Sequence, residues 1–197
     1  MERRYPIDGP TASGFLLLSL GLLILPLRWV LAWLLAAAIH ECCHLIAVKL
    51  CGGSVAALRL NGWGASMVAN DLSAPQEFLC VLAGPIGGAG VLLMLMRFLP
   101  ATAVCGLLQS AYNLLPFIDL DGGWALKIAL EFILPKEKAA RIAWIVHAIC
   151  VLVVLSFGIY SAFWLKLGIM PLILSIWLVI KGNSGKRPCN QSHLAVQ

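Results

Sequence analysis

The chain has 197 residues, of which 61% are apolar and only 12% are charged, and its mean hydropathy is +0.93. This composition excludes an ordinary soluble domain, whose core does not need so much apolar sequence. Fourteen Lys and Arg against nine Asp and Glu give a net charge of +5. The basic residues lie between apolar runs rather than in patches interleaved with aromatic residues, which argues against nucleic acid as a partner.

Apolar runs long enough to cross a bilayer recur along the whole chain. A helix needs about 20 residues to cross about 30 Å of hydrocarbon. We count six such runs, at residues 11–27, 29–50, 77–99, 101–134, 142–160 and 163–180. The first could be a signal peptide, but apolar sequence continues beyond any cleavage point and favours a retained helical hairpin. We therefore expect an all-α polytopic membrane protein of about six transmembrane helices, with residues 1–197 forming one membrane domain that ends in a tail at 181–197.

The basic residues between the runs predict the orientation of the chain in the membrane. If the N-terminus is cytoplasmic, six spans leave only Arg28, Arg97 and Lys166 on the opposite side. The other Lys and Arg residues then lie at cytoplasmic ends, as the positive-inside rule requires. We therefore expect both termini to be cytoplasmic.

Three ionisable residues, His40, Glu41 and His44, lie in the middle of the second run, where burying such groups is expensive. On a helix, His40 and His44 lie one turn apart on one face, so both imidazoles can reach one metal ion, and the spacing suits Zn²⁺. Glu41 is rotated by about 100° from His40, near enough to accept a proton from a water molecule on the metal. The alternative is that the histidines only form hydrogen bonds within the bundle. Cys42 and Cys43 lie off the face shared by both histidines, so we expect them to pack rather than to bind metal.

Between the second and third runs, residues 57–67 contain the pair Asn61-Gly62 between two short, partly alternating segments. This pattern favours a short β-hairpin. On the cytoplasmic side, an edge of such a hairpin could accept an extended substrate by strand addition. The alternative is an interfacial loop with Trp63 anchored at the headgroups.

Two histidines leave a catalytic zinc one protein ligand short, since such sites usually hold three protein groups and an open position. The candidates in apolar context are Asp119, Asp121, Glu131 and His147. Asp119 and Asp121 follow Pro116, which disrupts the helix, and broken helix at membrane depth is tolerated where it lines a cavity or is buried by protein. Counted along their spans, His40 and Asp121 both fall in the cytoplasmic half of the bilayer. For His147, which begins the fifth run, we expect a structural role.

The sequence HECCH at residues 40–44, followed by NLLP at 113–116 and LDGG at 120–123, resembles the site-2 protease family of intramembrane zinc metalloproteases. The resemblance covers residues 29–134 and implies a three-helix metalloprotease core there. It implies that His40, His44 and Asp121 bind Zn²⁺ and that Glu41 is the catalytic general base. It also implies that Asn113 lies near the metal and binds substrate. The resemblance selects Asp121 over Asp119, a choice that reasoning from the residues alone leaves open.

A further family feature is the Gly-Pro element in the intervening run, here Gly84-Pro85 followed by Ile86-Gly87-Gly88. The family element often continues to an asparagine, and this chain has glycine instead. The small residues permit close helix packing.

The size of the chain leaves no room for a PDZ or CBS domain. Its six expected spans and orientation resemble the bacterial branch that includes the sporulation protease acting on a membrane-tethered sigma-factor precursor. The resemblance implies a protease of the bacterial cytoplasmic membrane that cleaves within or next to a transmembrane segment of a membrane-tethered protein. Its partners would then be that substrate, the lipid bilayer and a regulatory membrane protein.

Two other classes of function fit parts of the same pattern. One is a non-catalytic membrane binding or chaperone homologue that keeps the metal for structure, and an intact Glu41 argues against it. The other is a small metal or proton transporter, which predicts polar groups at several depths along a path. In this chain the polar groups concentrate at one level, which favours the protease.

Overall fold

The computed structural model describes residues 25–61, 64–118 and 120–164, together with residues 172, 173, 175, 176, 179 and 180. Most of these residues are helical. The chain divides into two compact units, Met1–Tyr112 and Asn113–Gln197. Most of the first predicted run and most of the sixth lie outside the described residues, so the count of six spans stays a prediction.

The first unit is built around the helix α2, Leu27–Leu50, which follows Pro26 and coincides with the second predicted run. Its C-terminus is a Schellman motif: the N–H of Gly53 bonds the carbonyl of Val48 at 2.9 Å, and the N–H of Gly52 bonds that of Lys49 at 3.1 Å. Gly52 has a φ of +78°, a conformation that residues with a side chain rarely adopt. This motif turns the chain sharply from α2 into the strands.

Two strands follow α2, β1 (Ser54–Asn61) and β2 (Gly64–Asn70). They pair antiparallel, with Asn61 opposite Gly64 and Ser54 opposite Asn70, and a register shift falls between Val55 and Ala57. Gly62 and Trp63, which would form the predicted turn, lie outside the described residues. The strands connect α2 to the next long helical segment.

That segment comprises α3 (Ala74–Leu82), the π-helical turn η1 (Ala83–Gly87) and α4 (Gly88–Leu95). It begins at Ser73, whose N–H donates to the side chain of Gln76 at 2.9 Å, as in a capping box. The segment therefore starts three residues before the predicted run 77–99 and ends four residues earlier. Pro85 lies within the turn η1. A proline has no N–H and its ring clashes with the carbonyl four residues back, so a local change to wider π-type winding accommodates it within an otherwise continuous helix.

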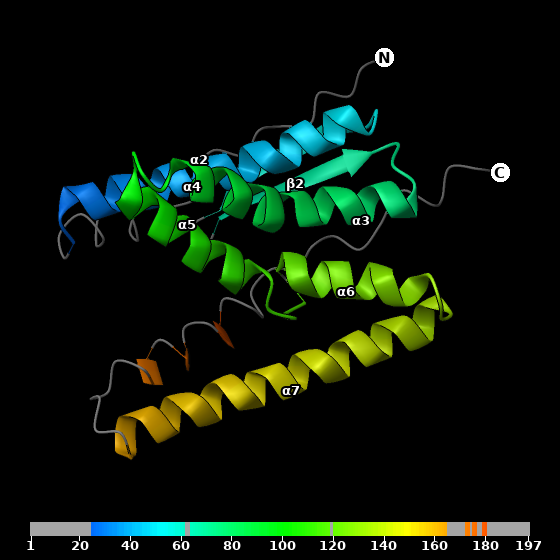
Figure 1. The fold of residues 1–197 in the computed structure, drawn as a ribbon. Helices are drawn as coiled ribbons and strands as arrows, with labels where there is room; N and C mark the ends of the chain where they lie inside the picture. Colours follow the sequence, from blue (N-terminus) through cyan, green and yellow to red (C-terminus); the bar gives the residue numbers. More distant parts are fainter. Residues whose placement is uncertain are drawn as a thin grey trace. The chain divides into compact units, whose positions relative to one another are not determined.

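The segment α3–η1–α4 packs against α2, as Figure 1 shows. The helix α5, Pro100–Asn113, completes the first unit. Its core is made of small side chains around one leucine: Ala32, Ala36, Leu92, Ala103 and Cys105. Gly106 lies where a Cβ atom would come within 1.9 Å of the Leu92 side chain, so the close packing of α5 requires glycine there.

The fourth predicted run, 101–134, contains two helices, and the break that Pro116 predicts lies between them. The helix α5 ends at Asn113, a loop that contains Pro116 follows, and α6 (Asp121–Glu131) begins in the second unit. The helix α7, Lys136–Phe163, follows Pro135 and begins six residues before the predicted fifth run. Lys136, Glu137 and Lys138 form its polar first turn, which a pattern of apolar residues does not reveal. In the second unit α6 packs along α7 (Figure 1).

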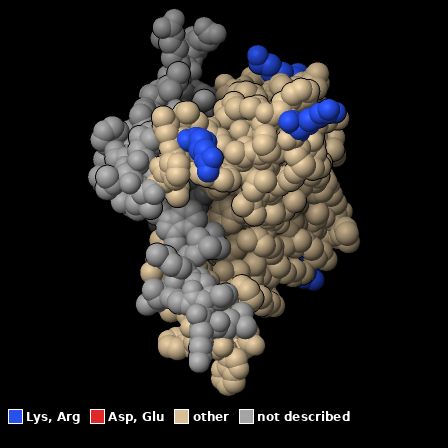
Figure 2. Space-filling view, turned by 60° about the vertical axis from the view of Figure 1, so that its left-hand side comes forward, with Lys and Arg blue, Asp and Glu red and all other residues tan. Residues whose placement is uncertain are grey.

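Three described helical segments, 27–50, 74–95 and 136–163, are long and apolar enough to cross a membrane. Their packing supports this, because α7 buries small or polar residues and exposes large apolar ones such as Leu152 and Phe157. Small residues at helix contacts and large apolar ones outside are typical of helices in lipid. Among the described residues, the face in Figure 2 shows only a few separate Lys and Arg side chains. We therefore describe the chain as a membrane protein.

Candidate metal centre

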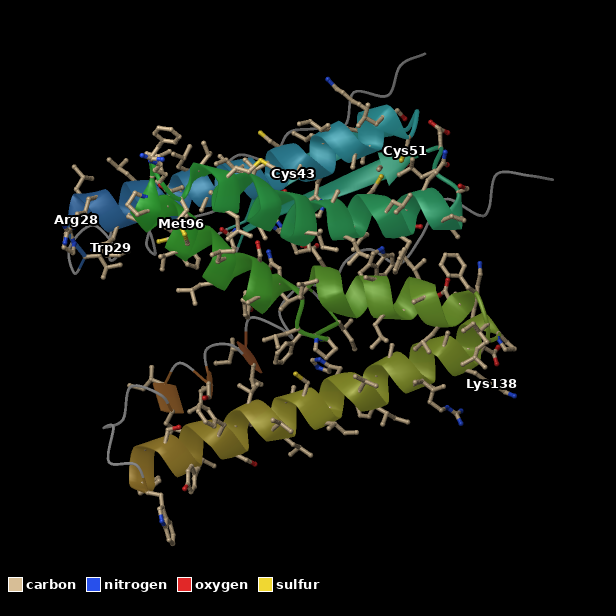
Figure 3. The ribbon with its side chains drawn as sticks, in the orientation of Figure 1. Arg28, Trp29, Cys43, Cys51, Met96 and Lys138 are labelled. Atoms are coloured by element: carbon tan, nitrogen blue, oxygen red, sulfur yellow. The ribbon has the colours of Figure 1, made fainter. Side chains whose placement is uncertain are left out.

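The buried face of α2 carries both histidines of the HECCH sequence. Apart from Val30, its buried residues recur every four positions, at Ala32, Ala36, His40, His44 and Val48. Residues four apart on a helix are neighbours on one face. Figure 3 shows α2 running from Arg28 and Trp29 at one end, past Cys43, to Cys51 at the other. The histidines are therefore held well inside the length of the helix, with small alanine side chains preceding them on the same ridge.

The two imidazole rings meet through their Nε2 atoms, which lie 3.2 Å apart. The ring centroids of His40 and His44 are 4.8 Å apart and the ring planes cross at 82°. Both residues are buried, with exposed fractions of 3% and 8%. Two nitrogen atoms facing each other at this distance either share a proton or share a cation.

The carbonyl of Cys80 on α3 fixes the orientation of the His44 ring. Nδ1 of His44 lies 2.7 Å from the oxygen of Cys80. A carbonyl can only accept, so Nδ1 donates the proton, and in a neutral ring Nε2 carries the lone pair. Histidine ligands of metals commonly donate their other ring N–H to a carbonyl in this way. The arrangement presents Nε2 of His44 as a ligand atom.

This geometry fits a tetrahedral zinc site. With Zn–N bonds of about 2.0–2.1 Å, two nitrogen ligands of one tetrahedral ion lie roughly 3.3–3.4 Å apart. The observed separation of the His40 and His44 Nε2 atoms, 3.2 Å, is close to that value. The donor set and its spacing are therefore suited to Zn²⁺.

Two glycines, Gly84 in η1 and Gly88 at the start of α4, allow the backbone to lie close to the histidines because they lack side chains. A Cβ atom at Gly84 would lie 2.0 Å from Nε2 of His44, and one at Gly88 would lie 3.4 Å from Cα of His40. π-Helical turns occur often at functional sites. The Gly-Pro element of the sequence thus corresponds to the contact between this helix and the two histidines.

Glu41 follows His40 on α2 and is partly buried. It lies one residue round the helix from the histidine ridge, as the sequence predicts. Cys42 is exposed, and Cys43 makes van der Waals contact with the position of Gly87, where a Cβ would lie 3.4 Å from its sulfur. Both thiols are free, and neither belongs to the buried ridge.

Asp121 is the first residue of α6 in the second unit, and it is buried. The preceding loop folds closely over this helix start: the N–H of Leu120 bonds the carbonyl of Phe117 at 2.9 Å. A Cβ at Gly122 would lie 2.1 Å from the oxygen of Leu114, and one at Gly123 would lie 2.0 Å from that of Phe117. The double glycine of LDGG therefore allows the loop to lie against the first turn of α6.

The other candidate ligands have different surroundings. Asp119 lies outside the described residues. Glu131, at the end of α6, lies 3.8 Å from the ammonium group of Lys127, one turn away. His147 is buried on α7, where Nδ1 accepts a hydrogen bond from the N–H of Ile118 at 3.4 Å. Asn113 is the last residue of α5 and is partly buried.

The structure thus brings together His40, His44 and Glu41 on one helix, with Asp121 and Asn113 assigned to the second unit. Sequence reasoning missed the Cys80 carbonyl, whose contact spans 36 positions in the chain. No residue type signals a carbonyl acceptor. It also did not foresee that Gly84 lies against His44, although the Gly-Pro element marked the segment.

No protein-family model matches the sequence, and no curated protein matches it. Among solved structures, the fold is similar to that of the site-2 protease from Methanocaldococcus jannaschii, with a TM-score of 0.65. The two chains are 20% identical, and the match covers 94% of this chain and 95% of the other. The chain therefore has the fold of a site-2 protease.

Proposed function

We propose that the chain is an intramembrane zinc metalloprotease that hydrolyses a peptide bond within or next to a transmembrane segment of a membrane-tethered protein. The observation that carries this proposal is the facing pair of Nε2 atoms of His40 and His44 beside Glu41, with His44 oriented by the Cys80 carbonyl. The shared fold with a site-2 protease supports the same conclusion independently of the residues.

In this proposal, His40 and His44 bind Zn²⁺ through nitrogen and Asp121 of the second unit binds through a carboxylate oxygen, one ligand atom from each residue. A bound zinc ion supplies Lewis-acid chemistry, polarising a peptide carbonyl and making water acidic enough to lose a proton near neutral pH. Two nitrogens and one oxygen leave a fourth tetrahedral position open, which distinguishes a catalytic from a structural site.

Glu41 acts as the general base. It accepts the proton of the attacking water and passes it to the leaving amine as the peptide bond breaks. Its position directly after His40, on a rigid helix, holds the carboxylate next to the ligand face without making it a ligand. Asn113 at the end of α5 is proposed to hold the substrate backbone through its side-chain amide, which can both donate and accept hydrogen bonds.

A peptide bond within a helix must be unwound before water can attack it, so the extended segment needs a binding surface. The pair β1–β2 is a two-stranded sheet, and an extended peptide can bind a sheet edge through main-chain hydrogen bonds. We propose that this sheet binds the unwound substrate next to the cytoplasmic end of α2. In this proposal the C-terminal end of α2 is on the cytoplasmic side of the membrane, and both termini of the chain are cytoplasmic as well.

The experiment that tests the proposal is co-expression of the wild type or Glu41→Gln with tagged single-span proteins, a membrane-tethered sigma-factor precursor among them. Cleavage is followed as a fragment on a gel, and zinc is measured in each purified protein. Glu41→Gln preserves the size and polarity of the side chain but removes the base. We expect the fragment with the wild type alone, and equal zinc in both proteins.

Other outcomes point to the other classes of function. Cleavage by Glu41→Gln at the wild-type rate would contradict the role of Glu41. Bound zinc without cleavage of any candidate would favour a non-catalytic homologue, or a protease whose regulatory membrane partner is missing from the assay. Active wild-type protein without zinc would contradict the mechanism.

A further inference from the structure

The loop before Asp121 is held by a residue that the proposed mechanism does not use. His147 on α7 is buried, with an exposed fraction of 5%, and lies opposite Phe117 and Ile118 of the loop. We propose that His147 is a positioning residue that holds this loop and thereby places the carboxylate of Asp121 for zinc. The inference rests on the proposed function, because it assumes that Asp121 is a ligand.

The first contact is a hydrogen bond. The N–H of Ile118 points to Nδ1 of His147, and the two nitrogen atoms are 3.4 Å apart. A backbone N–H can only donate, so Nδ1 accepts, and a neutral ring then carries its proton on Nε2. The bond is partly buried, and Ile118 itself is 38% exposed, so water only partly replaces an acceptor that is lost there.

The second contact is aromatic. The rings of Phe117 and His147 have centroids 5.5 Å apart and planes that cross at 75°, an edge-to-face arrangement. Phe117 is fully buried, so its ring cannot turn away without leaving a cavity. Together the ring contact and the hydrogen bond attach two successive loop residues to α7.

The attached loop residue Phe117 also contacts the start of α6, where Asp121 lies. The carbonyl of Phe117 accepts the N–H of Leu120, and it also lies against Gly123 in the first turn of α6. Ile118 is three residues from Asp121, so the fixed point and the ligand are joined by little free chain. Ligand groups held by surrounding contacts bind metal more tightly, and removing such a partner typically lowers affinity about 10–100-fold.

Three variants of the full-length protein in detergent micelles test this inference. His147→Leu removes the acceptor and keeps an apolar side chain, whereas His147→Asn offers an oxygen near the position of Nδ1. Ser161→Ala is the matched control, because Ser161 is a buried polar residue of α7 whose hydroxyl donates to Phe157 of the same helix. Zinc affinity is measured by competition with a chromophoric chelator, and exchange of the Ile118 amide by mass spectrometry.

We expect His147→Leu to bind zinc about tenfold more weakly and to exchange the Ile118 amide faster. His147→Asn should stay within about threefold of the wild type because the acceptor is restored, and Ser161→Ala should match the wild type. Wild-type zinc affinity in His147→Leu would overturn the inference, whether or not exchange becomes faster. An equal loss of zinc affinity in His147→Asn and His147→Leu would also overturn it, because the hydrogen-bond acceptor would then contribute nothing to zinc binding.

These measurements separate the inference from the proposed function. If the wild type binds no zinc, the proposed function fails, while amide exchange at Ile118 still reports whether His147 holds the loop. If the wild type binds zinc and cleaves substrate but His147→Leu is unchanged, the inference alone fails.

Discussion

Gly84 lies directly against the imidazole of His44, so that a Cβ atom at position 84 would come within 2.0 Å of Nε2. One turn earlier on the same helical segment, the carbonyl of Cys80 accepts the Nδ1 proton of His44 at 2.7 Å. The segment α3–η1 therefore contacts the ring at both nitrogen atoms. The ring cannot move away from an added methyl group without losing the hydrogen bond to Cys80.

Gly84→Ala is expected to lower zinc affinity on the order of 100-fold and to remove cleavage, because the methyl group would displace the metal-binding nitrogen. Gly90→Ala is the matched control, since a Cβ there would meet no atom within 4 Å. Zinc content after dialysis and substrate cleavage check both variants. Full zinc content in Gly84→Ala would contradict the contact between Gly84 and His44.

Asp121→Asn is expected to lower zinc affinity by roughly tenfold or more, because an amide oxygen is a neutral and weaker ligand than a carboxylate. Glu131→Gln makes the same change at the other end of α6, where the carboxylate pairs with Lys127. That variant should bind zinc as the wild type does. Competition with a zinc chelator measures the zinc affinity of both variants. An equal loss of affinity in the two variants would contradict the role of Asp121 as a ligand.

Removal of the metal should abolish cleavage reversibly. Incubation with 1,10-phenanthroline should stop cleavage, and added Zn²⁺ or Co²⁺ should restore it, because two nitrogens and one oxygen suit these ions. Mg²⁺ prefers oxygen ligands and should not restore activity. The isomer 1,7-phenanthroline, which cannot chelate, is the control. Activity that survives full depletion of zinc would contradict the proposed chemistry.

Gly123→Ala tests whether the loop before Asp121 lies against the first turn of α6. Alanine favours a helix more than glycine does, so an open position would gain stability. At position 123, however, the Cβ would lie 2.0 Å from the Phe117 oxygen. We expect weaker zinc binding and a lower midpoint of thermal unfolding in detergent. A higher midpoint with unchanged zinc affinity would show that the loop does not lie against α6.

Leu92→Ala tests the core of the first unit. Leu92 is fully buried among the alanine residues of α2 and α5, so its loss leaves a cavity and should cost about 2 kcal/mol or more of unfolding free energy. Leu93→Ala is the control, because that side chain is 54% exposed. Denaturant unfolding in mixed micelles compares them. Equal destabilisation would argue against the described core.

Much of the helical structure follows from local sequence. The helix α2 coincides with its predicted run to within two residues, because no Pro or Gly interrupts the sequence between Pro26 and Gly52. The break that Pro116 predicts within the run 101–134 is confirmed, since α5 ends at Asn113 and α6 begins at Asp121. The first six residues of α7 were not predicted, because they include polar residues and the prediction was based on apolar content.

The candidate site was also predicted only in part from the sequence. The spacing of His40 and His44 predicts a pair of ligands on one face, since residues four apart are neighbours on any helix. The resemblance to site-2 proteases selected Asp121 among the candidate ligands and added Asn113, and both remain proposals. The spacing could not predict which nitrogen of each ring faces its partner, because that depends on contacts from another helix.

The sequence by itself thus determined the membrane character of the chain, the paired histidines and the neighbouring Glu41, because hydropathy and helical periodicity are local properties. Only the tertiary structure decided that the Cys80 carbonyl orients His44, that Gly84 leaves room for its ring, and that His147 contacts the loop before Asp121. These contacts join residues 29 to 40 positions apart. Such contacts form only when helices pack, and Cys80 and Ile118 take part through backbone groups, which their residue types do not reveal.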